Sequence, residues 1–558
     1  MESIQSRTVL KLIRKPVNKI SNGIRFQIAS LAPPTARILP TLWHDRAAIS
    51  LHDAQFSPAT DEKQAIPEDI ITAVVNRLRR FRSICSDFGV PTENVHVLAT
   101  EATRVAINSD VFRARIQDAT GLEVRLLSRD EEAWFGALGL TGSSRDINGV
   151  VMDLGGGSVQ ISWVGHRDKT TSATADSEYG ISLPYGAAAL KGRLEDVRVQ
   201  GAKAKSELEE EVRNRLRQAC LQLNIHGDVQ QKEAQGGFDL YLSGGGFRGW
   251  GYVLMHTSHP YPIPMINGYR VDKERFGDTQ AVLDAVSQRD VEIFGVSKRR
   301  ASQIPSIAVL VNAVVEALPG VRNVQFCQGG VREGFLLDQL PPEVRNQDPL
   351  LAATAIYAID APRSTDSISE LLASSLPETG FPEIVSPTLL DALANLMYAH
   401  SNIPKETRSA AALHNTTTGI LASANSITHQ DRALLALILC ERWPGDLAPA
   451  DQTVFTRLQH CLSPAEAWWA RYLGRVATLI GEVYPSGIVN QQDWRVRLEA
   501  GTVPDKKTET GLRLNIVRNE RAPGLREIVE EAGTRIEKSG KRKKRVEGYG
   551  MRVVVNIS

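Results

Sequence analysis

The chain has 558 residues, of which 42% are hydrophobic and 23% charged, enough for roughly two to four domains of ordinary globular composition. Lys and Arg together number 65 and Asp and Glu 64, so no overall charge favours nucleic acid or a membrane surface as a partner. The five cysteines lie far apart without a Cys-x-x-Cys pair, which argues against a disulfide framework or a zinc site. The apolar runs are too short to span a bilayer, and residues 1–19 make a poor transit peptide, so a cytoplasmic protein is expected.

From about residue 7 to residue 164, short apolar runs alternate with amphipathic segments, which predicts a layered α/β domain. Apolar residues between Ile70 and Cys85 recur at helical spacing and predict a helix over 67–88, with Pro67 in its first turn. The other elements expected here are strands at 23–29, 47–51, 94–100, 122–127 and 149–153, and helices through Arg104, from Ser109 and at 131–140.

A second α/β unit is predicted next, with helices at 201–223 and 305–318 and strands at 238–242 and 324–327. Residues 350–482 are rich in Ala and Leu and predict a nearly all-helical domain. The last stretch has strands at 512–517 and 552–557 around a basic run, 538–545, that is typical of a solvated loop or, alternatively, of a patch for nucleic acid or an acidic partner. The expected domains are therefore 1–165, 166–340, 350–482 and 483–558.

The segment Asp153-Leu154-Gly155-Gly156-Gly157-Ser158 follows a buried strand and is the most informative in the chain. Glycines leave backbone N–H groups uncovered, and a turn of such groups forms an anion-binding concavity suited to phosphate. The Asp153 carboxylate offers oxygen ligands to Mg²⁺, and Ser158 adds a hydroxyl donor. The alternative is a plain glycine-rich hairpin turn with Asp153 as its cap.

Two further glycine turns end strands, at Ser243–Gly246 and at Gln328–Gly330. Each alone is more typical of an ordinary turn. Three such turns spread over two α/β units favour two facing lobes that hold a polyphosphate chain between them.

Several stretches, in order and spacing, resemble the signature of the exopolyphosphatase/guanosine-pentaphosphatase family. They are Thr100 to Ala106, then Asn108, Phe112, Gly121 and Ser128, then Glu131-Glu132-Ala133, and finally Asp153 to Ser158. The resemblance covers about residues 21–334, where Arg332-Glu333-Gly334 is similar to the family's closing motif. Residues 23–26, 33–37 and 160–163 look closest to its fungal retrograde-regulation branch, whose members signal mitochondrial dysfunction to nuclear genes.

The resemblance implies an α/β fold of two actin-like (ribonuclease H-like) lobes, followed by a mainly helical domain and a small α/β tail. It also implies that Glu132 is the catalytic carboxylate that orients or deprotonates water, and that Arg104 contacts phosphate. Asp153 would associate with Mg²⁺, and the phosphate loop would be Gly155, Gly156, Gly157 and Ser158. Taken without the resemblance, Glu132 is more simply an acid in the first turn of a helix, and Arg104 a surface arginine.

The chain departs from the family's first phosphate motif, Asp-x-Gly-Ser-Asn. The aligned stretch is Asn18-Lys19-Ile20-Ser21-Asn22, so Ser21 and Asn22 match as phosphate-binding residues, but the aspartate is an amide and the glycine a β-branched residue. A basic segment, 7–19, replaces the strand expected before it. Either this half of the site is lost, or the first exon of the gene model is wrong.

Two other differences concern catalysis and the helical region. Gln160 stands where phosphatases of the family place glutamate, and an amide cannot accept a proton. Residues 411–415, with His400 and His429, resemble the His-Asp domain of bacterial exopolyphosphatases, but Asn415 replaces the aspartate. Isolated helix histidines are the alternative, and no metal is placed there.

Three functions follow from these residues. The first is a retrograde-regulation signalling protein that binds a phosphate-rich ligand with weak or no hydrolysis; Asn18, Ile20 and Gln160 favour it. The second is an active Mg²⁺-dependent phosphatase for polyphosphate or guanosine penta- or tetraphosphate, favoured by Glu132 and Arg104. The third is a partner-binding scaffold. Expected partners are polyphosphate, these guanosine phosphates or ATP and GTP, regulatory proteins and, as a possibility, a second copy of the chain, but neither nucleic acid nor a membrane.

Overall fold

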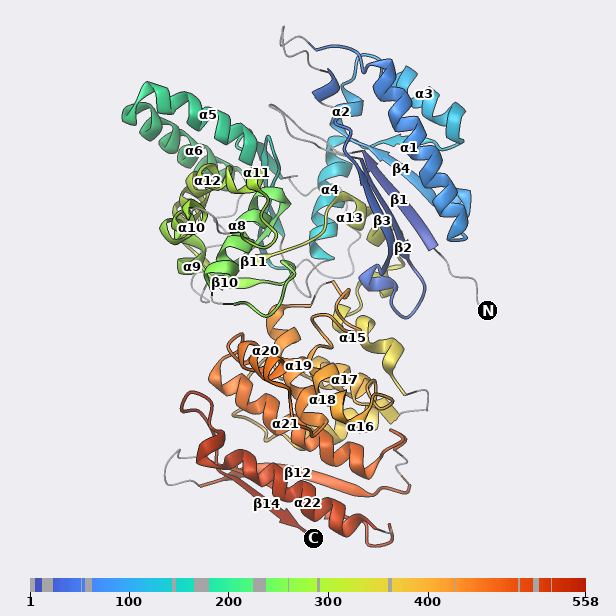
Figure 1. Ribbon diagram of the computed structural model, residues 1–558, viewed down its shortest axis with the longest axis vertical. Helices are drawn as coiled ribbons and strands as arrows, with labels where there is room; N and C mark the ends of the chain where they lie inside the picture. Colours follow the sequence, from blue (N-terminus) through green and yellow to red (C-terminus); the bar gives the residue numbers. More distant parts are fainter. Residues whose placement is uncertain are drawn as a thin grey trace. The chain divides into compact units, whose positions relative to one another are not determined.

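The computed structural model describes residues 6–12, 24–51, 53–55, 63–142, 147–164, 180–223, 237–258, 260–288, 292–359, 364–425, 427–489, 492–504, 511–522 and 524–558. The chain divides into two compact units (Figure 1). The first comprises Met1–Tyr261 with Met265–Asn346, and the second comprises Pro262–Pro264 with Gln347–Ser558.

The first unit begins with a five-stranded sheet of order β3-β2-β1-β4-β5. Its strands are β1 (Ser6–Leu12), β2 (Ile24–Ser30), β3 (Thr41–Ala47), β4 (Val95–Ala99) and β5 (Val124–Leu126). β1 lies antiparallel to β2 and parallel to β4, so the basic segment expected to replace this strand is instead a central strand as far as residue 12. The strand expected at 47–51 ends at Ala47, because the preceding residues 41–47 pair with β2.

Helices cover both faces of this sheet (Figure 1). On one face lie α1 (Glu68–Asp87) and α3 (Ser109–Thr120), whose buried residues contact β2 and β4; the ring centroids of Phe26 and Phe81 are 5.0 Å apart. Pro67 is the N-cap of α1, just before its first turn. The short α2 (Glu101–Arg104) follows β4. On the other face, α4 (Arg129–Thr141) and α13 (Val331–Asp338) pack against Ala29 and Leu98.

The second sheet has six strands in the order β10-β11-β9-β6-β7-β8. They are β6 (Gly149–Leu154), β7 (Val159–Val164), β8 (Ile181–Leu183), β9 (Phe238–Ser243), β10 (Arg270–Asp272) and β11 (Val321–Phe326). β9 lies between β6 and β11 and is parallel to both. Residues 149–164, expected in the first lobe, therefore belong to this sheet, because β6 pairs with β9.

The largest buried cluster of the unit lies between this sheet and its helices. These helices are α5 (Ala187–Gln200), α6 (Ala202–Gln222), α8 (Gly244–Thr257), α9 (Lys273–Gly277), α10 (Thr279–Ser287), α11 (Lys298–Ala301) and α12 (Ile304–Ala317). The glycine turn expected at 243–246 is the beginning of α8, so a helix starts where only a turn was predicted. A short helix, α14 (Pro342–Arg345), ends the unit.

The helices α4 and α13 cross with their backbones in contact. A Cβ atom at Gly139 would overlap the backbone of Gly330, and one at Gly334 would overlap the carbonyl of Phe135. Next to this crossing, the Phe135 and Phe335 rings meet edge to face at 5.4 Å. α4 also contributes Leu140 to a small cluster with Val151 and Tyr241 of the second sheet. One helix pair thus packs against both sheets.

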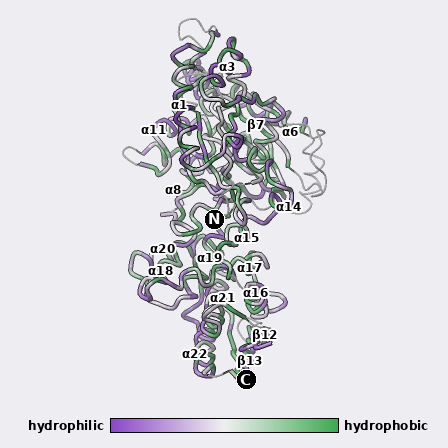
Figure 2. The backbone as a smooth tube through the Cα atoms, turned by 90° about the vertical axis from the view of Figure 1, so that its right-hand side faces the viewer, coloured by the Kyte–Doolittle hydropathy of each residue, from purple (hydrophilic) through white to green (hydrophobic). Residues whose placement is uncertain are grey.

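The second unit is a helical layer joined to a three-stranded sheet. Its helices are α15 (Pro349–Thr354), α16 (Ser364–Ser374), α17 (Pro387–Leu396), α18 (Lys405–Leu413), α19 (His429–Arg442), α20 (Pro449–Gln459), α21 (Pro464–Val483) and α22 (Leu525–Glu537). Its strands are β12 (Val496–Val503), β13 (Gly511–Arg518) and β14 (Val553–Ile557), with β13 in the centre. The apolar stretches of α19 and α21, coloured green in Figure 2, are the buried centre.

Cys85, Cys220, Cys327 and Cys440 are buried, and Cys461 is partly exposed. No helix among the described residues is long and apolar enough to cross a membrane.

Candidate functional site

Glu132, in the first turn of α4, meets Arg104, the last residue of α2, beyond the carboxyl ends of β4 and β5. Glu132 Oε2 lies 3.7 Å from Arg104 Nη2, and the two side chains are only 15% and 23% exposed. Arg104 also donates through Nη1 to the carbonyl of Leu127. A carboxylate held in this way can accept a proton or orient water, and the guanidinium beside it can contact a phosphate oxygen.

The first turn of α4 is fixed by its capping box. The Ser128 hydroxyl accepts from the Glu131 N–H at 3.0 Å, and Glu131 Oε2 accepts from the Ser128 N–H at 2.8 Å. Burial acts to raise the pKa of Glu131, but its hydrogen bonds from Ser128 and Arg125 lower it overall. The Glu131 carboxylate is thus already used in capping the helix. Glu132 is the neighbouring acid that faces Arg104.

The glycine segment after β6 is a tight hairpin turn into β7, which is the local structure that the alternative reading expected. The Gly155 N–H donates to the Ser158 carbonyl at 3.0 Å, and Asp153 lies directly opposite Gln160. Opposite residues of an antiparallel pair point to the same face, so the Asp153 carboxylate and the Gln160 amide are neighbours.

The carbonyl side of this turn is packed on the beginning of α5. Ala187, Ala188 and Ala189 donate their N–H groups to the carbonyls of Gly155 and Gly156 at 2.8–3.0 Å. A Cβ at Gly186, the N-cap of α5, would overlap the nitrogens of Gly157 and Ser158. Gly155 itself is exposed. The turn therefore has one closed side against α5 and one side open to solvent.

The Asp153 carboxylate lies at the beginning of α8. Gly244 has φ +94°, and a Cβ there would overlap Asp153 Oδ1, so only glycine permits this approach. The partial positive charge of a helix N-terminus stabilises a carboxylate in this place. Nearby, the Ser243 hydroxyl donates to the Gly329 carbonyl at 3.4 Å. All three glycine turns thus meet at the carboxyl edge of β6, β9 and β11, where open α/β sheets bind their ligands.

Arginines from the first sheet and from helices α8, α11 and α13 gather near this edge. Arg25 of β2 lies directly opposite Arg46 of β3, and like charges in that position repel each other. Arg332 and Arg248 also act on Arg25 electrostatically, and Arg46 acts in turn on Arg299 and Arg300. We call these residues the arginine cluster: Arg25, Arg46, Arg248, Arg299, Arg300 and Arg332.

The pKa of Arg25 is lowered to about 10, first by desolvation and then by Arg332 and Arg46. Its side chain nevertheless remains exposed to solvent. Desolvation and the arginines nearby, Arg248 among them, also lower the pKa of Arg300, and desolvation with Arg46 lowers that of Arg299. One acid near Arg25 is Glu333, which lies 3.1 Å from Arg332. Surrounding protein thus reduces hydration while the guanidinium groups stay accessible, which suits an anionic ligand.

The structure brings Arg104 to Glu132, and Asp153 to the Gly155–Ser158 turn. Ser21 and Asn22, together with Asn18 and Ile20, lie outside the described residues. The arginine cluster was missed because its members are spread over some three hundred residues, although Arg25 and Arg332 stand within stretches that carry the resemblance. The Arg-rich run at 298–300 was the one local signal.

The resemblance at 411–415 leads to a buried polar group. Asn415 and His400 are nearly inaccessible, and burial lowers the pKa of His400. His414, the histidine next to Asn415, is instead hydrogen-bonded to Asp451 at 2.8 Å. Among the described residues, no group of three or more His, Cys, Asp or Glu side chains is arranged to hold a metal ion.

Both parts of the chain are similar to known protein families. Residues 39–343 match the model of the Ppx/GppA phosphatase family, and residues 348–558 match that of the RTG2 C-terminal domain. Retrograde regulation protein 2 of Saccharomyces cerevisiae is 37% identical over 556 residues, which cover 96% of this chain and 89% of that protein. Exopolyphosphatase 1 of Mycobacterium tuberculosis is 25% identical over 308 residues, 52% of this chain and 79% of that protein.

Among solved structures, the type II variant of the Aquifex aeolicus Ppx/GppA phosphatase is 20% identical, with a TM-score of 0.44 over 61% of this chain and 100% of that chain. An exopolyphosphatase from Cytophaga hutchinsonii is 18% identical, with a TM-score of 0.43 over 61% of this chain and 99% of that chain. The family model spans more than half of the chain and the yeast relative nearly all of it. This chain therefore belongs to the Ppx/GppA phosphatase family, in the branch of the yeast retrograde regulation protein, and has the family's actin-like α/β fold.

Proposed function

We propose that this chain is a cytoplasmic retrograde-regulation signalling protein that binds a phosphate-rich ligand and hydrolyses it weakly or not at all. The ligand class is polyphosphate, guanosine penta- or tetraphosphate, or ATP or GTP. The arginine cluster carries the proposal. Arg25 and Arg46 stand directly opposite each other, although like charges in that position cost roughly 0.2–1 kcal/mol without a bound anion.

A chain of phosphates suits this arrangement better than a single anion. The cluster draws on two sheets: Arg25 and Arg46 come from the first, and Arg248, Arg299 and Arg300 from helices of the second. Guanidinium groups bind phosphate oxygens with paired donors, so several in sequence match several phosphates. The exposed part of the Gly155–Ser158 turn lies at the carboxyl edge of the second sheet, where the ligand can contact it.

Mg²⁺ fits as part of the ligand. Asp153 offers a single carboxylate, and Mg²⁺ is commonly held by one or two carboxylates together with phosphate oxygens and water. We propose that Asp153 contacts the cation, directly or through water, only once a phosphate ligand has brought it. The ion would neutralise phosphate charge there.

Weak hydrolysis is supported by Gln160, which is the neighbour of Asp153 across β6 and β7 and cannot accept a proton. The Arg104–Glu132 pair is the observation that favours the alternative, an active Mg²⁺-dependent phosphatase, because Glu132 is placed to orient water. A scaffold that binds no phosphate ligand is the remaining alternative.

Binding is tested by isothermal titration of the full chain with polyphosphate, guanosine pentaphosphate, ATP and GTP in the presence of Mg²⁺. The expected result is saturable binding of at least one of them, weakened in the double variant Arg25→Gln/Arg46→Gln. The matched control is Arg77→Gln/Arg80→Gln, which removes two exposed charges from α1. Equal affinity in both variants, or no binding at all, would refute the proposal.

Hydrolysis is tested by phosphate release from the bound ligand, for the natural chain and for Glu132→Gln. The proposal expects slow or undetectable release in both proteins while binding is kept. Rapid turnover that disappears in Glu132→Gln establishes the phosphatase instead.

A further inference from the structure

The basic run of the second unit is a fixed structure and not the freely solvated loop that its composition suggests. We call Lys538–Arg545 the basic loop; six of its eight residues are Lys or Arg. Two short 3-10 turns, Lys538–Gly540 and Arg542–Lys544, fold it back on itself. A Cβ at Gly540 would overlap the nitrogen of Val553, so the loop lies directly against the beginning of β14.

Three side chains from one face of α21 hold the loop, two through its backbone and one through the Ser539 hydroxyl. The Trp468 indole N–H donates to the Ser539 carbonyl at 3.2 Å, and Arg471 Nη1 donates to the Lys544 carbonyl at 2.6 Å. Arg475 Nη1 donates to the Ser539 hydroxyl at 3.0 Å. Trp468 is fully buried, and Ser539 is 1% exposed. The loop conformation is therefore set before any partner arrives.

The anchors hold the loop on the protein, while most of its cationic side chains extend into solvent. Lys538, Lys541, Arg542 and Lys543 are exposed. None of the six loop cations forms an ion pair within 4.0 Å with another residue that the structure describes. Desolvation, followed by Arg471 and Arg475, lowers the pKa of Lys544. The fold thus places cations beside cations, an arrangement that an anionic partner would stabilise.

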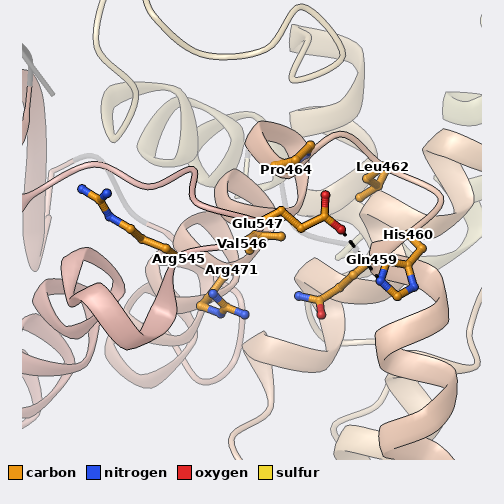
Figure 3. A pocket seen from close by; sticks show the side chains of 8 residues that line it. All are labelled: Gln459, His460, Leu462, Pro464, Arg471, Arg545, Val546 and Glu547. Atoms are coloured by element: carbon orange, nitrogen blue, oxygen red, sulfur yellow. Dashed lines mark ion pairs between the residues drawn. The ribbon is translucent and has the colours of Figure 1, made fainter.

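A pocket of about 240 Å³ lies at the end of the loop (Figure 3). Figure 3 shows the Arg471 guanidinium, the Gln459 amide and the His460–Glu547 pair around it, with Arg545 extending outward. His460 Nε2 and Glu547 Oε1 are 3.9 Å apart. Leu462, Pro464 and Val546 form the apolar part of the wall. The pocket therefore offers donors at one side and apolar contacts at the other.

We propose that the basic loop and this pocket form a docking site for an acidic, Asp/Glu-rich segment of a partner protein. The segment's carboxylates would face the exposed loop cations, and one of its side chains would enter the pocket between Arg471 and the apolar wall. This site is separate from the phosphate-binding residues of the first unit and does not depend on them.

A protein segment fits better than a nucleic acid. The apolar wall of the pocket suits an amino-acid side chain. The chain as a whole carries a formal charge of only +1, so it lacks the broad positive field that nucleic acid binding draws on.

The experiment measures fluorescence anisotropy of a short fluorescein-labelled Asp/Glu peptide with the full chain. The test variant is Lys541→Gln/Arg542→Gln/Lys543→Gln, whose side chains make no hydrogen bond that anchors the loop. The matched control is Lys405→Gln/Arg513→Gln/Arg521→Gln, which removes three exposed charges elsewhere in the second unit. Because one exposed ion pair changes affinity by a factor of about 1.4–5, we expect roughly tenfold weaker binding in the test variant and little change in the control.

Arg545→Gln alone is a second variant, expected to weaken binding by a factor of about 1.4–5 without touching the anchors. Competition with a Ser/Gly peptide, a DNA duplex and anionic vesicles completes the design. The proposal is supported when the Asp/Glu peptide binds, the Ser/Gly peptide does not compete, and only the loop variants lose affinity. It is overturned when the peptide does not bind, when both triple variants bind alike, or when DNA or vesicles bind more tightly than the peptide.

Discussion

Replacing Arg25 by Gln should make the ligand-free protein more stable. The guanidinium is charged at neutral pH in both the folded and the unfolded chain, but folding lowers its pKa from 12.5 to about 10. A base whose pKa is lowered by folding is held in its charged form at a cost, so stability rises when the charge is removed. The whole shift would correspond to about 3 kcal/mol. Because Arg25 is exposed, solvent screening reduces this to about 1 kcal/mol.

The assay is thermal unfolding of the ligand-free chain, followed by the same scan with polyphosphate and Mg²⁺. For a unit of this size, about 1 kcal/mol raises the unfolding midpoint by roughly 1–3 °C. The ligand should then raise the midpoint less in Arg25→Gln than in the natural chain, since a binding contact is gone. Arg80→Gln, an exposed arginine of α1, should change neither value.

A double-mutant cycle with Arg46→Gln isolates the repulsion itself. If the cross-strand pair repels, the second substitution adds less stability than it does alone, by roughly 0.2–1 kcal/mol. A ligand-free Arg25→Gln protein that unfolds at a lower temperature than the natural chain would refute the reasoning, as would strict additivity in the cycle.

Three further outcomes are expected. Gly186→Ala places a methyl group on the nitrogens of Gly157 and Ser158, so it should lower the free energy of unfolding by about 1–3 kcal/mol and weaken phosphate binding in titration. Gly192→Ala, where the added methyl group meets open space, should have neither effect. Arg432→Met leaves the carbonyls of Thr416, Leu421 and Ala424 without their buried donor and should destabilise the second unit by about 3 kcal/mol or more in urea unfolding. Arg513→Met, at an exposed position, should leave stability unchanged. Equal losses of stability in the two variants would contradict this. Burial lowers the pKa of His400, so the unfolded chain binds a proton there more readily than the folded chain does. Stability should therefore fall on acidification below about pH 6.5, by at most about 1.4 kcal/mol per pH unit. His400→Leu should reduce this pH dependence in unfolding measured between about pH 7 and pH 5.

The sequence predicted the elements whose patterns are strong and local. The helix 68–87 was expected from its apolar spacing, and the strand 149–154 from its run of buried residues. The strand 41–47 was misplaced because it is an edge strand with much of its surface in water, which blurs the alternation. The helix from Gly244 was missed because three glycines at its start have low helix propensity, and tertiary packing of its buried residues overrides that preference.

The candidate site was predictable only where a motif is continuous. Asp153, the glycine turn and Glu132 stand in short runs whose chemistry can be read residue by residue. Arg25 and Arg46 are cross-strand neighbours because of the register in which β2 pairs with β3. Since the strand at 41–47 was misplaced, that register could not be predicted. The electrostatic effect of Arg248 and Arg332 on Arg25 depends on how the elements of two sheets pack, which no local pattern encodes.

The crossing of α4 and α13 has an evolutionary consequence. At Gly139 and Gly334 each added methyl group would strike main-chain atoms on the other side of the crossing. In most packed pairs a larger residue on one side can be offset by a smaller one opposite, and the two positions drift together. Here both positions are already glycine, which has no side chain to shorten, so neither can offset a larger residue at the other. Each glycine must therefore be retained independently. Across relatives of this chain, the two positions should show invariance without covariation.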